Sequence, residues 1–221
     1  MGCTTLEGGR RVSGASVPYN NIDGQVHGAA GEELQRALDR IAEGRRLPAP
    51  KQTTSSGPYR GALLPSSAGG RIACYTGDAV TTPAFGALRS FSRVIVHAIA
   101  PDGRMAQRSP ELVALLRRTY SSAIQAASAA GATSLAIPSL GSGVNGWPAK
   151  RTAHIGTGAV AEWLEGQTTG SSSRVERLDL VLNSPEALRL WLACARERLG
   201  EPTVAETDSL SMAIWSSELS A

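Results

Sequence analysis

The sequence predicts an α/β protein with a largely parallel sheet covered by helices on both faces. Short apolar runs occupy residues 94–100, 135–138 and 178–182, and stretches with the apolar spacing of amphipathic helices lie between and after them. This alternation is typical of parallel sheets, because two parallel strands need a crossover connection that is usually a helix. Ligands of such sheets bind at the carboxyl ends of the strands.

Four segments have apolar residues at helical spacing. They cover residues 24–43, 111–130, about 149–165, and 186–199. Gly44 provides a stop for the first of them. Two others begin with the same tripeptide, Ser-Pro-Glu, at Ser109 and Ser184. A serine cap, a proline at the first helical position and an acid facing the positive end of the helix dipole explain these two starts.

Composition narrows the class of protein. The 221 residues are 42% hydrophobic, 19% charged and 5% aromatic, which excludes wholesale disorder. No apolar run reaches the roughly 18 residues of a membrane span and the N-terminus has no secretory pattern, so the expectation is a cytoplasmic or nuclear protein. Lys and Arg are dispersed, so nucleic acid is not indicated. Cys3, Cys74 and Cys194 have neither disulfide-framework nor zinc-site spacing, and no metal or cofactor is predicted.

We expect one domain over residues 1–200 and a polar tail over residues 201–221. Residues 45–70 are rich in Pro, Ser and Gly without periodicity, and are interpreted as an insertion in that domain. The tail carries a lone Trp215 and is expected outside the core.

A glycine-rich segment directly after the apolar run 135–138 is the strongest functional signal. Glycines let the backbone approach a ligand, so main-chain N–H groups and the positive end of the following helix could hold a phosphate or diphosphate. The candidate ligand-binding residues in this segment are Ser139, Leu140, Gly141, Ser142, Gly143, Val144, Asn145 and Gly146.

Two other interpretations of this segment stay open. Gly141, Gly143 and Gly146 also satisfy G-x-G-x-x-G, the dinucleotide fingerprint, although a single match to that pattern is weak. A Rossmann domain would carry the pattern after its first strand and place an acid at the end of the next strand, where this sequence has Asn183. A plain glycine turn between a strand and a helix is the other interpretation.

Four segments, in the same order along the chain, resemble the macrodomain family of ADP-ribose-binding modules. Residues 134–163 (SLAIPSLGSGVNGWPAKRTAHIGTGAVAEW) are similar to the family signature, and residues 22–31 (IDGQVHGAAG) to its loop-to-helix segment. Residues 75–88 (YTGDAVTTPAFGAL) are similar to its threonine-glycine strand entry, and residues 94–101 (VIVHAIAP) to its central strand. The resemblance extends over residues 22–200.

The resemblance implies a three-layer α/β/α sandwich with a mixed, largely parallel central sheet, whose crest holds ADP-ribose between two loops. The segment 139–146 would wrap the pyrophosphate and the distal ribose with backbone N–H groups. The other loop, around residues 20–24, would close over the same diphosphate and face the distal ribose. Its candidate ligand-binding residues are Ile22, Asp23 and Gly24, and Asn183 is a further candidate. The implied partners are ADP-ribose or ADP-ribosylated proteins, with no cofactor.

Asp23 is the one candidate catalytic residue. It stands where the hydrolytic members resembled carry the acid that activates a water or the substrate ribose; its alternative role is the N-cap of the helix over residues 24–43. Two N-terminal motifs depart from the family: residues 2–5 (GCTT) replace its Gly-Asp-Ile, and residues 13–16 (SGAS) its Asn-Ala-Ala-Asn. The N-terminal part is therefore expected to be degenerate or truncated, and binding is favoured over turnover.

Three functions stay open. The preferred one is binding of ADP-ribose or mono-ADP-ribosylated protein without cleavage. The second is an ADP-ribosyl hydrolase or O-acetyl-ADP-ribose deacetylase that uses Asp23. The third is a pseudo-macrodomain that has lost its ligand and serves as an interaction scaffold. His97 lies inside an apolar strand and is expected to be a hydrogen-bonded core residue rather than a catalyst.

Overall fold

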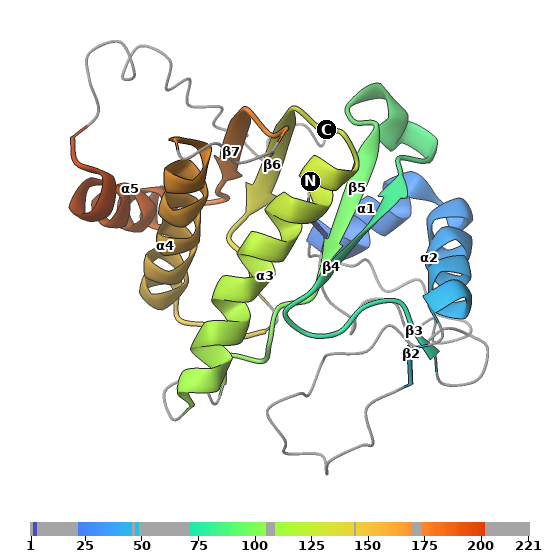
Figure 1. Ribbon diagram of the computed structural model, residues 1–221, viewed down its shortest axis with the longest axis horizontal. Coiled ribbons are helices and arrows are strands. Elements are labelled where there is room, and N and C mark those ends of the chain that lie inside the picture. Colours follow the sequence, from blue (N-terminus) through green and yellow to red (C-terminus); the bar gives the residue numbers. More distant parts are fainter. Residues whose placement is uncertain are drawn as a thin grey trace, which may run out of the picture.

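The computed structural model describes residues 2–3, 22–45, 47–48, 71–104, 109–143, 145–168 and 174–201. Figure 1 shows the arrangement of the elements. In chain order they are β1 (Gly2–Cys3), α1 (Ile22–Ala30), α2 (Glu32–Arg45), β2 (Leu47–Pro48), β3 (Arg71–Ile72), β4 (Ala79–Pro83), the 3-10 helix η1 (Gly86–Ser90), β5 (Val94–Ala98), α3 (Pro110–Ala129), β6 (Ser134–Pro138), α4 (Ala149–Thr168), β7 (Arg177–Val181) and α5 (Pro185–Leu199). The three predicted strands are β5, β6 and β7, and the last three predicted helices are α3, α4 and α5.

The strands pair in three small sheets. β1 is parallel to β5, with Gly2 opposite Val96, and β4 is antiparallel to β5. β6 is parallel to β7, and β2 is antiparallel to β3. The α/β class is confirmed, but these pairings do not form a single, largely parallel sheet. Only two residues of β1 are described, and they contact β6 without a ladder of hydrogen bonds to it.

Helices cover β5 on both faces. Successive strand residues point to opposite sides of a sheet. Ile95 packs with Val26 and Leu34 of α1 and α2, whereas the next residue, Val96, packs in a second cluster with Leu116 of α3. Figure 1 shows α3 and α1 on opposite sides of the β4–β5 pair. The segment that follows β5 therefore begins at a strand whose two faces are both packed against helices.

The segment predicted as one helix over residues 24–43 is two helices. The break lies at Gly31, whose φ of +72° is in the left-handed region that favours glycine. The N–H of Gly31 donates to the carbonyl of His27 at 2.9 Å, which ends α1, and α2 starts at Glu32. The prediction of a continuous helix was wrong, because a glycine inside a helical pattern does not by itself show whether the helix continues.

The two Ser-Pro-Glu helix starts use their serines differently. The hydroxyl of Ser184 accepts a hydrogen bond from the N–H of Ala187 at 3.1 Å, as a helix cap does. The hydroxyl of Ser109 instead donates to Oε2 of Glu111 at 2.6 Å, which holds the pKa of that carboxyl below its ordinary value. Both serines stand at the N-cap position as predicted, but only Ser184 accepts the capping hydrogen bond, because the hydroxyl of Ser109 is bound to the carboxylate of Glu111.

This difference leads to a stability prediction. Ser184→Ala is expected to lower the free energy of unfolding by about 1 kcal/mol, because the N–H of Ala187 loses its acceptor. Ser109→Ala is the matched control and is expected to change it by less than about 0.5 kcal/mol. Urea unfolding of both variants measures the effect. Equal losses in the two variants would contradict the assignment of the caps.

Several sequence predictions fall on residues outside this description. They concern the motifs in residues 4–21, the tail beyond residue 201 and all of the predicted insertion except Arg45 and the strand β2. Cys74 and Cys194 are free and buried, and burial raises the pKa of the Cys74 thiol to about 12. Within the described ranges, no helix is long and apolar enough to cross a membrane.

Candidate ligand-binding site

The glycine-rich loop connects the end of β6 to the start of α4. Two of its glycines have backbone conformations that favour glycine, because φ is +86° at Gly141 and +67° at Gly146. A side chain at Gly141 would also collide with the indole of Trp147, whose Cδ1 lies 2.8 Å from the position of a Cβ. Gly143 differs: it is exposed, and a Cβ there would meet nothing within 4 Å. The loop therefore needs two glycines for its shape and leaves the third open to solvent.

Hydrogen bonds inside the loop use part of its backbone. The N–H of Trp147 donates to the carbonyl of Gly141 at 3.0 Å, and the N–H of Gly146 donates to that of Gly143 at 2.9 Å. The N–H of Leu140 donates to the hydroxyl of Tyr120 at 2.8 Å, which ties the loop to α3. Burial raises the pKa of that hydroxyl, so Tyr120 stays neutral.

Other backbone N–H groups of the loop make no hydrogen bond within the described part of the protein. Among the described residues, the N–H groups of Gly141, Gly143 and Asn145 donate to no protein acceptor. Val144 lies outside the described residues. These three N–H groups lie within five residues and beside the N-terminus of α4, a place that suits an anion, and Gly143 is the exposed residue among the three.

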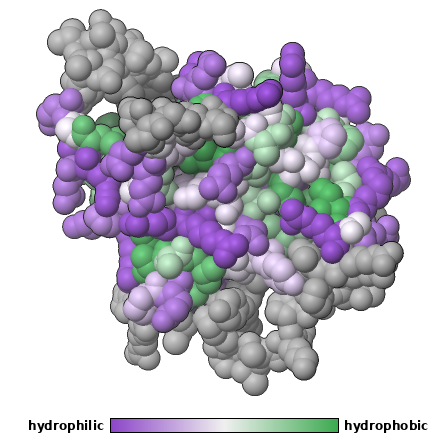
Figure 2. Space-filling model, in the orientation of Figure 1, coloured by the Kyte–Doolittle hydropathy of each residue, from purple (hydrophilic) through white to green (hydrophobic). Residues whose placement is uncertain are grey.

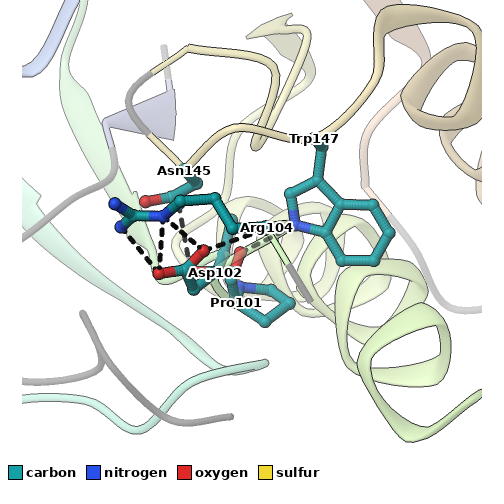
Figure 3. A network of polar contacts seen from close by, with 6 residues as sticks. Pro101, Asp102, Arg104, Asn145 and Trp147 are labelled. Carbon is teal, nitrogen blue, oxygen red and sulfur yellow. Dashed lines mark hydrogen bonds and ion pairs between the residues drawn. The ribbon is translucent and has the colours of Figure 1, made fainter. Parts of the chain in front are cut away.

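The other side of the loop is fixed to the segment that follows β5, as Figure 3 shows. The side-chain amide of Asn145 donates to the carbonyl of Ala100 at 3.1 Å, and the indole N–H of Trp147 donates to that of Pro101 at 2.7 Å. The N–H of Gly103 donates to the carbonyl of Asn145 at 2.6 Å. The side-chain amide of Asn145 is thus used within the protein, whereas its backbone N–H donates to no acceptor among the described residues.

Sequence reasoning missed the residues that lie against this loop. Arg104 binds Asp102 through Nε, at 2.9 and 3.0 Å from the two carboxylate oxygens, and through Nη2 at 2.7 Å. The backbone N–H of Arg104 donates to the same carboxylate at 2.9 Å. The stem of Arg104 lies on Gly146, where a Cβ would be 3.1 Å from its Cγ. The Pro-Asp-Gly sequence at residues 101–103 is a turn signal after a strand, and it was the clue available.

Asp23 lies in the first turn of α1 and is buried, with 6% of its surface exposed. Its Oδ1 is 3.8 Å from Nε2 of His27, one turn later in the same helix. Ile22 is exposed and Gly24 is buried. Because α1 begins at Ile22, Asp23 is not its N-cap, and that alternative does not hold. The carboxylate is instead held next to an imidazole at the side of β5.

The ring of His27 also lies close to the ring of His97, which belongs to β5. The two ring centres are 6.5 Å apart, and Nε2 of His97 lies 2.9 Å from the hydroxyl of Thr82. Burial, together with the nearby His27, lowers the pKa of His97 to about 3. The expectation of a hydrogen-bonded core histidine is confirmed.

The buried imidazole predicts a loss of stability in acid. The unfolded chain has the ordinary pKa of 6.5, so between pH 6.5 and 3 the unfolded state binds more protons than the folded state. The contribution of the neutral His97 to the free energy of unfolding is therefore fully present above pH 6.5, and it is lost as the pH falls from 6.5 toward 3. From pH 7 to pH 5, His97 is expected to cost about 2 kcal/mol of unfolding free energy.

Urea unfolding at the two pH values measures this loss. His97→Gln carries no titrating ring, so the variant is expected to lose about 2 kcal/mol less than the wild type over the same interval. If the variant and the wild type lose the same amount, the account of His97 is wrong.

Asn183 follows β7 and is exposed. Because Val181 of β7 is opposite Pro138 of β6, Asn183 lies at the same edge of this sheet as the loop. Two hollows of about 370 and 300 Å³ lie elsewhere. The larger is lined by Pro148, Lys150, Arg151, His154, Cys194 and Glu197. Neither hollow is lined by residues 139–146, so the candidate site depends on the backbone of the loop.

The chain is similar to known macrodomains. The family model described as Macro domain matches residues 64–156. One similar structure is a mutant of the Oceanobacillus iheyensis macrodomain with ADPR, which is 22% identical in sequence. The match covers 82% of this chain and 79% of the macrodomain chain, with a TM-score of 0.61. The same macrodomain with ADP is 22% identical over 81% of this chain and 76% of its own, at a TM-score of 0.58.

A third similar structure is the macro domain of ganglioside induced differentiation associated protein 2. It is 19% identical and covers 80% of this chain and 69% of its own, with a TM-score of 0.56. Residues 64–156 therefore match the Macro domain family, and the chain has the macrodomain fold.

Proposed function

We propose that this protein binds ADP-ribose through the loop over residues 139–146. The observation that carries the proposal is the set of backbone N–H groups at Gly141, Gly143 and Asn145, which have no acceptor in the described part of the chain. They lie at the carboxyl end of the parallel strand β6 and next to the start of α4, where an anionic diphosphate is stabilised. The Oceanobacillus iheyensis structures with ADPR and ADP support the choice of ligand.

The remaining candidate residues complete this proposal. Ile22, Asp23 and Gly24 would close over the diphosphate from α1, and Leu140 and Val144 would line it from the glycine-rich loop. Ser139, Ser142 and Asn183 would contact the ligand from the edge formed by β6 and β7. We propose one domain over residues 1–200, in which β1 joins β5 to β6 within a single mixed sheet of a three-layer sandwich.

The biological ligand in this proposal is a mono-ADP-ribosylated protein, bound without cleavage in the cytoplasm or nucleus. The free N–H groups can hold the diphosphate whether or not the distal ribose is attached to a protein.

Calorimetric titration with ADP-ribose tests the proposal. Saturable binding with a stoichiometry near one is expected, and adenosine should bind far more weakly because it has no diphosphate for the loop. Absence of heat at millimolar ADP-ribose, with protein that still unfolds cooperatively, would contradict binding.

Hydrolysis of an ADP-ribosyl bond is a second candidate function, which the position of Asp23 favours. Its carboxylate is buried 3.8 Å from the ring of His27, and a carboxylate with a fixed neighbour can act as a general base. Release of ADP-ribose from a peptide modified on a glutamate measures this activity. Turnover that Asp23→Asn abolishes would establish it, whereas no turnover by the wild type would leave binding alone.

A further inference from the structure

Three hydrogen bonds hold the segment after β5 in a fixed position on the glycine-rich loop. They join Asn145 to Ala100 and to Gly103, and Trp147 to Pro101, at 2.6 to 3.1 Å. A Cβ at Gly103 would lie 2.4 Å from two atoms of the Trp147 indole, so the two backbones are packed directly together. The residue that follows Gly103 is therefore placed by the loop itself.

That residue is Arg104, and its side chain is oriented by Asp102. The carboxylate of Asp102 receives both the Nε–H and Nη2–H groups, at 2.7 to 3.0 Å, together with the backbone N–H of Arg104. The side chain of Asp102 is 11% exposed, whereas that of Arg104 is 55% exposed. The acid is thus largely shielded from water, while the guanidinium is presented at the surface.

The side chain of Arg104 lies against the loop at Gly146 and Asn145 (Figure 3). The stem of Arg104 covers Gly146, with Cγ and Cδ at 3.1 and 3.8 Å from the position of a Cβ there. Figure 3 shows the guanidinium and the Asp102 carboxylate side by side next to Asn145. A planar, permanently charged donor at this place suits a phosphate oxygen.

Given the proposed function, on which this inference rests, we propose that the Asp102–Arg104 pair sets the charge that a diphosphate meets at the loop. Arg104 is a ligand-binding residue that favours anionic ligands over neutral ones. Asp102 acts through Arg104: it binds the guanidinium, whose stem lies on Gly146, and offsets its charge.

The pair predicts opposite effects for its two members. Removing the guanidinium takes one positive charge away from the loop, which should weaken the attraction of a diphosphate. Removing the carboxylate takes one negative charge away from the same place, which should strengthen that attraction. Arg104→Gln and Asp102→Asn change the charge at the loop by one unit each, in opposite directions. Asp102→Asn keeps the size of the side chain, and Arg104→Gln keeps a polar side chain.

Titrations of these variants with ADP-ribose and with inorganic pyrophosphate test the inference. Arg104→Gln is expected to weaken the binding of both anions about tenfold, whereas Asp102→Asn is expected to leave the affinity unchanged or to raise it up to about threefold. The dependence of affinity on salt should be weaker in Arg104→Gln than in the wild type and stronger in Asp102→Asn.

Two outcomes would overturn the inference. Equal weakening of binding in both variants would mean that the pair only supports the fold of the loop. Unchanged affinity and salt dependence in Arg104→Gln would mean that the guanidinium does not meet the ligand. Arg104→Lys keeps the charge but not the two-point contact with Asp102, and an affinity at least as low as that of Arg104→Gln would also count against a role of charge.

Two further measurements separate the possible failures. Arg117→Gln removes an arginine of similar exposure, which pairs with Glu162 between α3 and α4, and should leave ADP-ribose affinity unchanged. Absence of binding by the wild type would contradict the proposed function itself. Binding by the wild type with no difference among the variants would overturn the role of the pair alone.

Discussion

Replacing Trp147 with alanine is expected to lower the free energy of unfolding by about 3 to 5 kcal/mol, the cost of removing a large buried aromatic side chain. The indole is 2% exposed and fills the space between the loop and the segment after β5. The positions of a Cβ at Gly103 and at Gly141 lie only 2.4 and 2.8 Å from its Cδ1, so both backbones pack on the ring. Its removal leaves a cavity that two glycines cannot fill.

The same substitution breaks one of the bonds that join the loop to the protein. The indole N–H donates to the carbonyl of Pro101 at 2.7 Å, and this buried acceptor would lose its partner. Trp147→Phe is the milder change, because it keeps one aromatic ring while it removes the N–H group and part of the volume of the indole. We expect Trp147→Phe to cost about 1 to 3 kcal/mol.

Thermal and urea unfolding of the two variants measure these losses, and a titration with ADP-ribose shows whether the loop retains its function. The affinity of Trp147→Ala for ADP-ribose should fall together with its stability. A variant that unfolds at the wild-type urea concentration would show that Trp147 does not join the loop to the segment after β5.

Replacing Gly143 with glutamate is expected to weaken ADP-ribose binding by roughly 100-fold, or about 2.8 kcal/mol, because a negative side chain would meet the diphosphate at close range. The fold should tolerate this change. Gly143 is exposed, its φ lies outside the left-handed region, and a Cβ meets nothing within 4 Å. Affinity should therefore fall while the unfolding temperature stays close to that of the wild type.

Gly44→Glu is the matched control for this variant. Gly44 lies in α2, is exposed and also has nothing within 4 Å of a Cβ. It receives the same charge away from the loop, and its affinity for ADP-ribose should equal that of the wild type. Calorimetric titration of the three proteins measures the difference. Wild-type affinity in Gly143→Glu would mean that the diphosphate does not bind at this loop.

The elements were predictable where a residue pattern determines the local structure. The helical spacing and the Ser-Pro-Glu starts predicted α3 and α5, and the apolar runs predicted β5, β6 and β7. The break at Gly31 was not predictable, because the apolar pattern continues across it from α1 to α2. The antiparallel pairing of β4 with β5 was missed for another reason, since direction depends on contacts between segments rather than on spacing within one.

For the candidate site, the sequence predicted the glycine-rich backbone of the loop but not the side-chain contacts around it. The glycines at 141 and 146 do adopt the conformations that a tight loop requires, and such glycines are visible in the sequence. The inward amide of Asn145 was not, because its acceptor, the carbonyl of Ala100, is 45 residues away. The Asp102–Arg104 pair was missed for the same physical reason: its importance comes from contact with Gly146, which no local pattern encodes.

The surface contains other charged groups that could also attract an anion, so a test of the loop must distinguish binding there from binding elsewhere. Figure 2 shows hydrophilic residues spread widely over one face of the molecule, so weak anion binding at several places has to be distinguished from binding at the loop. The larger hollow has Lys150, Arg151 and His154 in its lining, together with Glu197, and is one alternative place for an anion.

The most direct test follows the backbone amide resonances of ¹⁵N-labelled protein during a titration with ADP-ribose. Binding at the loop should give saturable shifts at the amides of Gly141, Gly143 and Asn145, with one common dissociation constant and little change at the amides of Arg151 and His154. Unshifted loop amides in a folded protein, or saturable shifts confined to the hollow between α4 and α5, would contradict it.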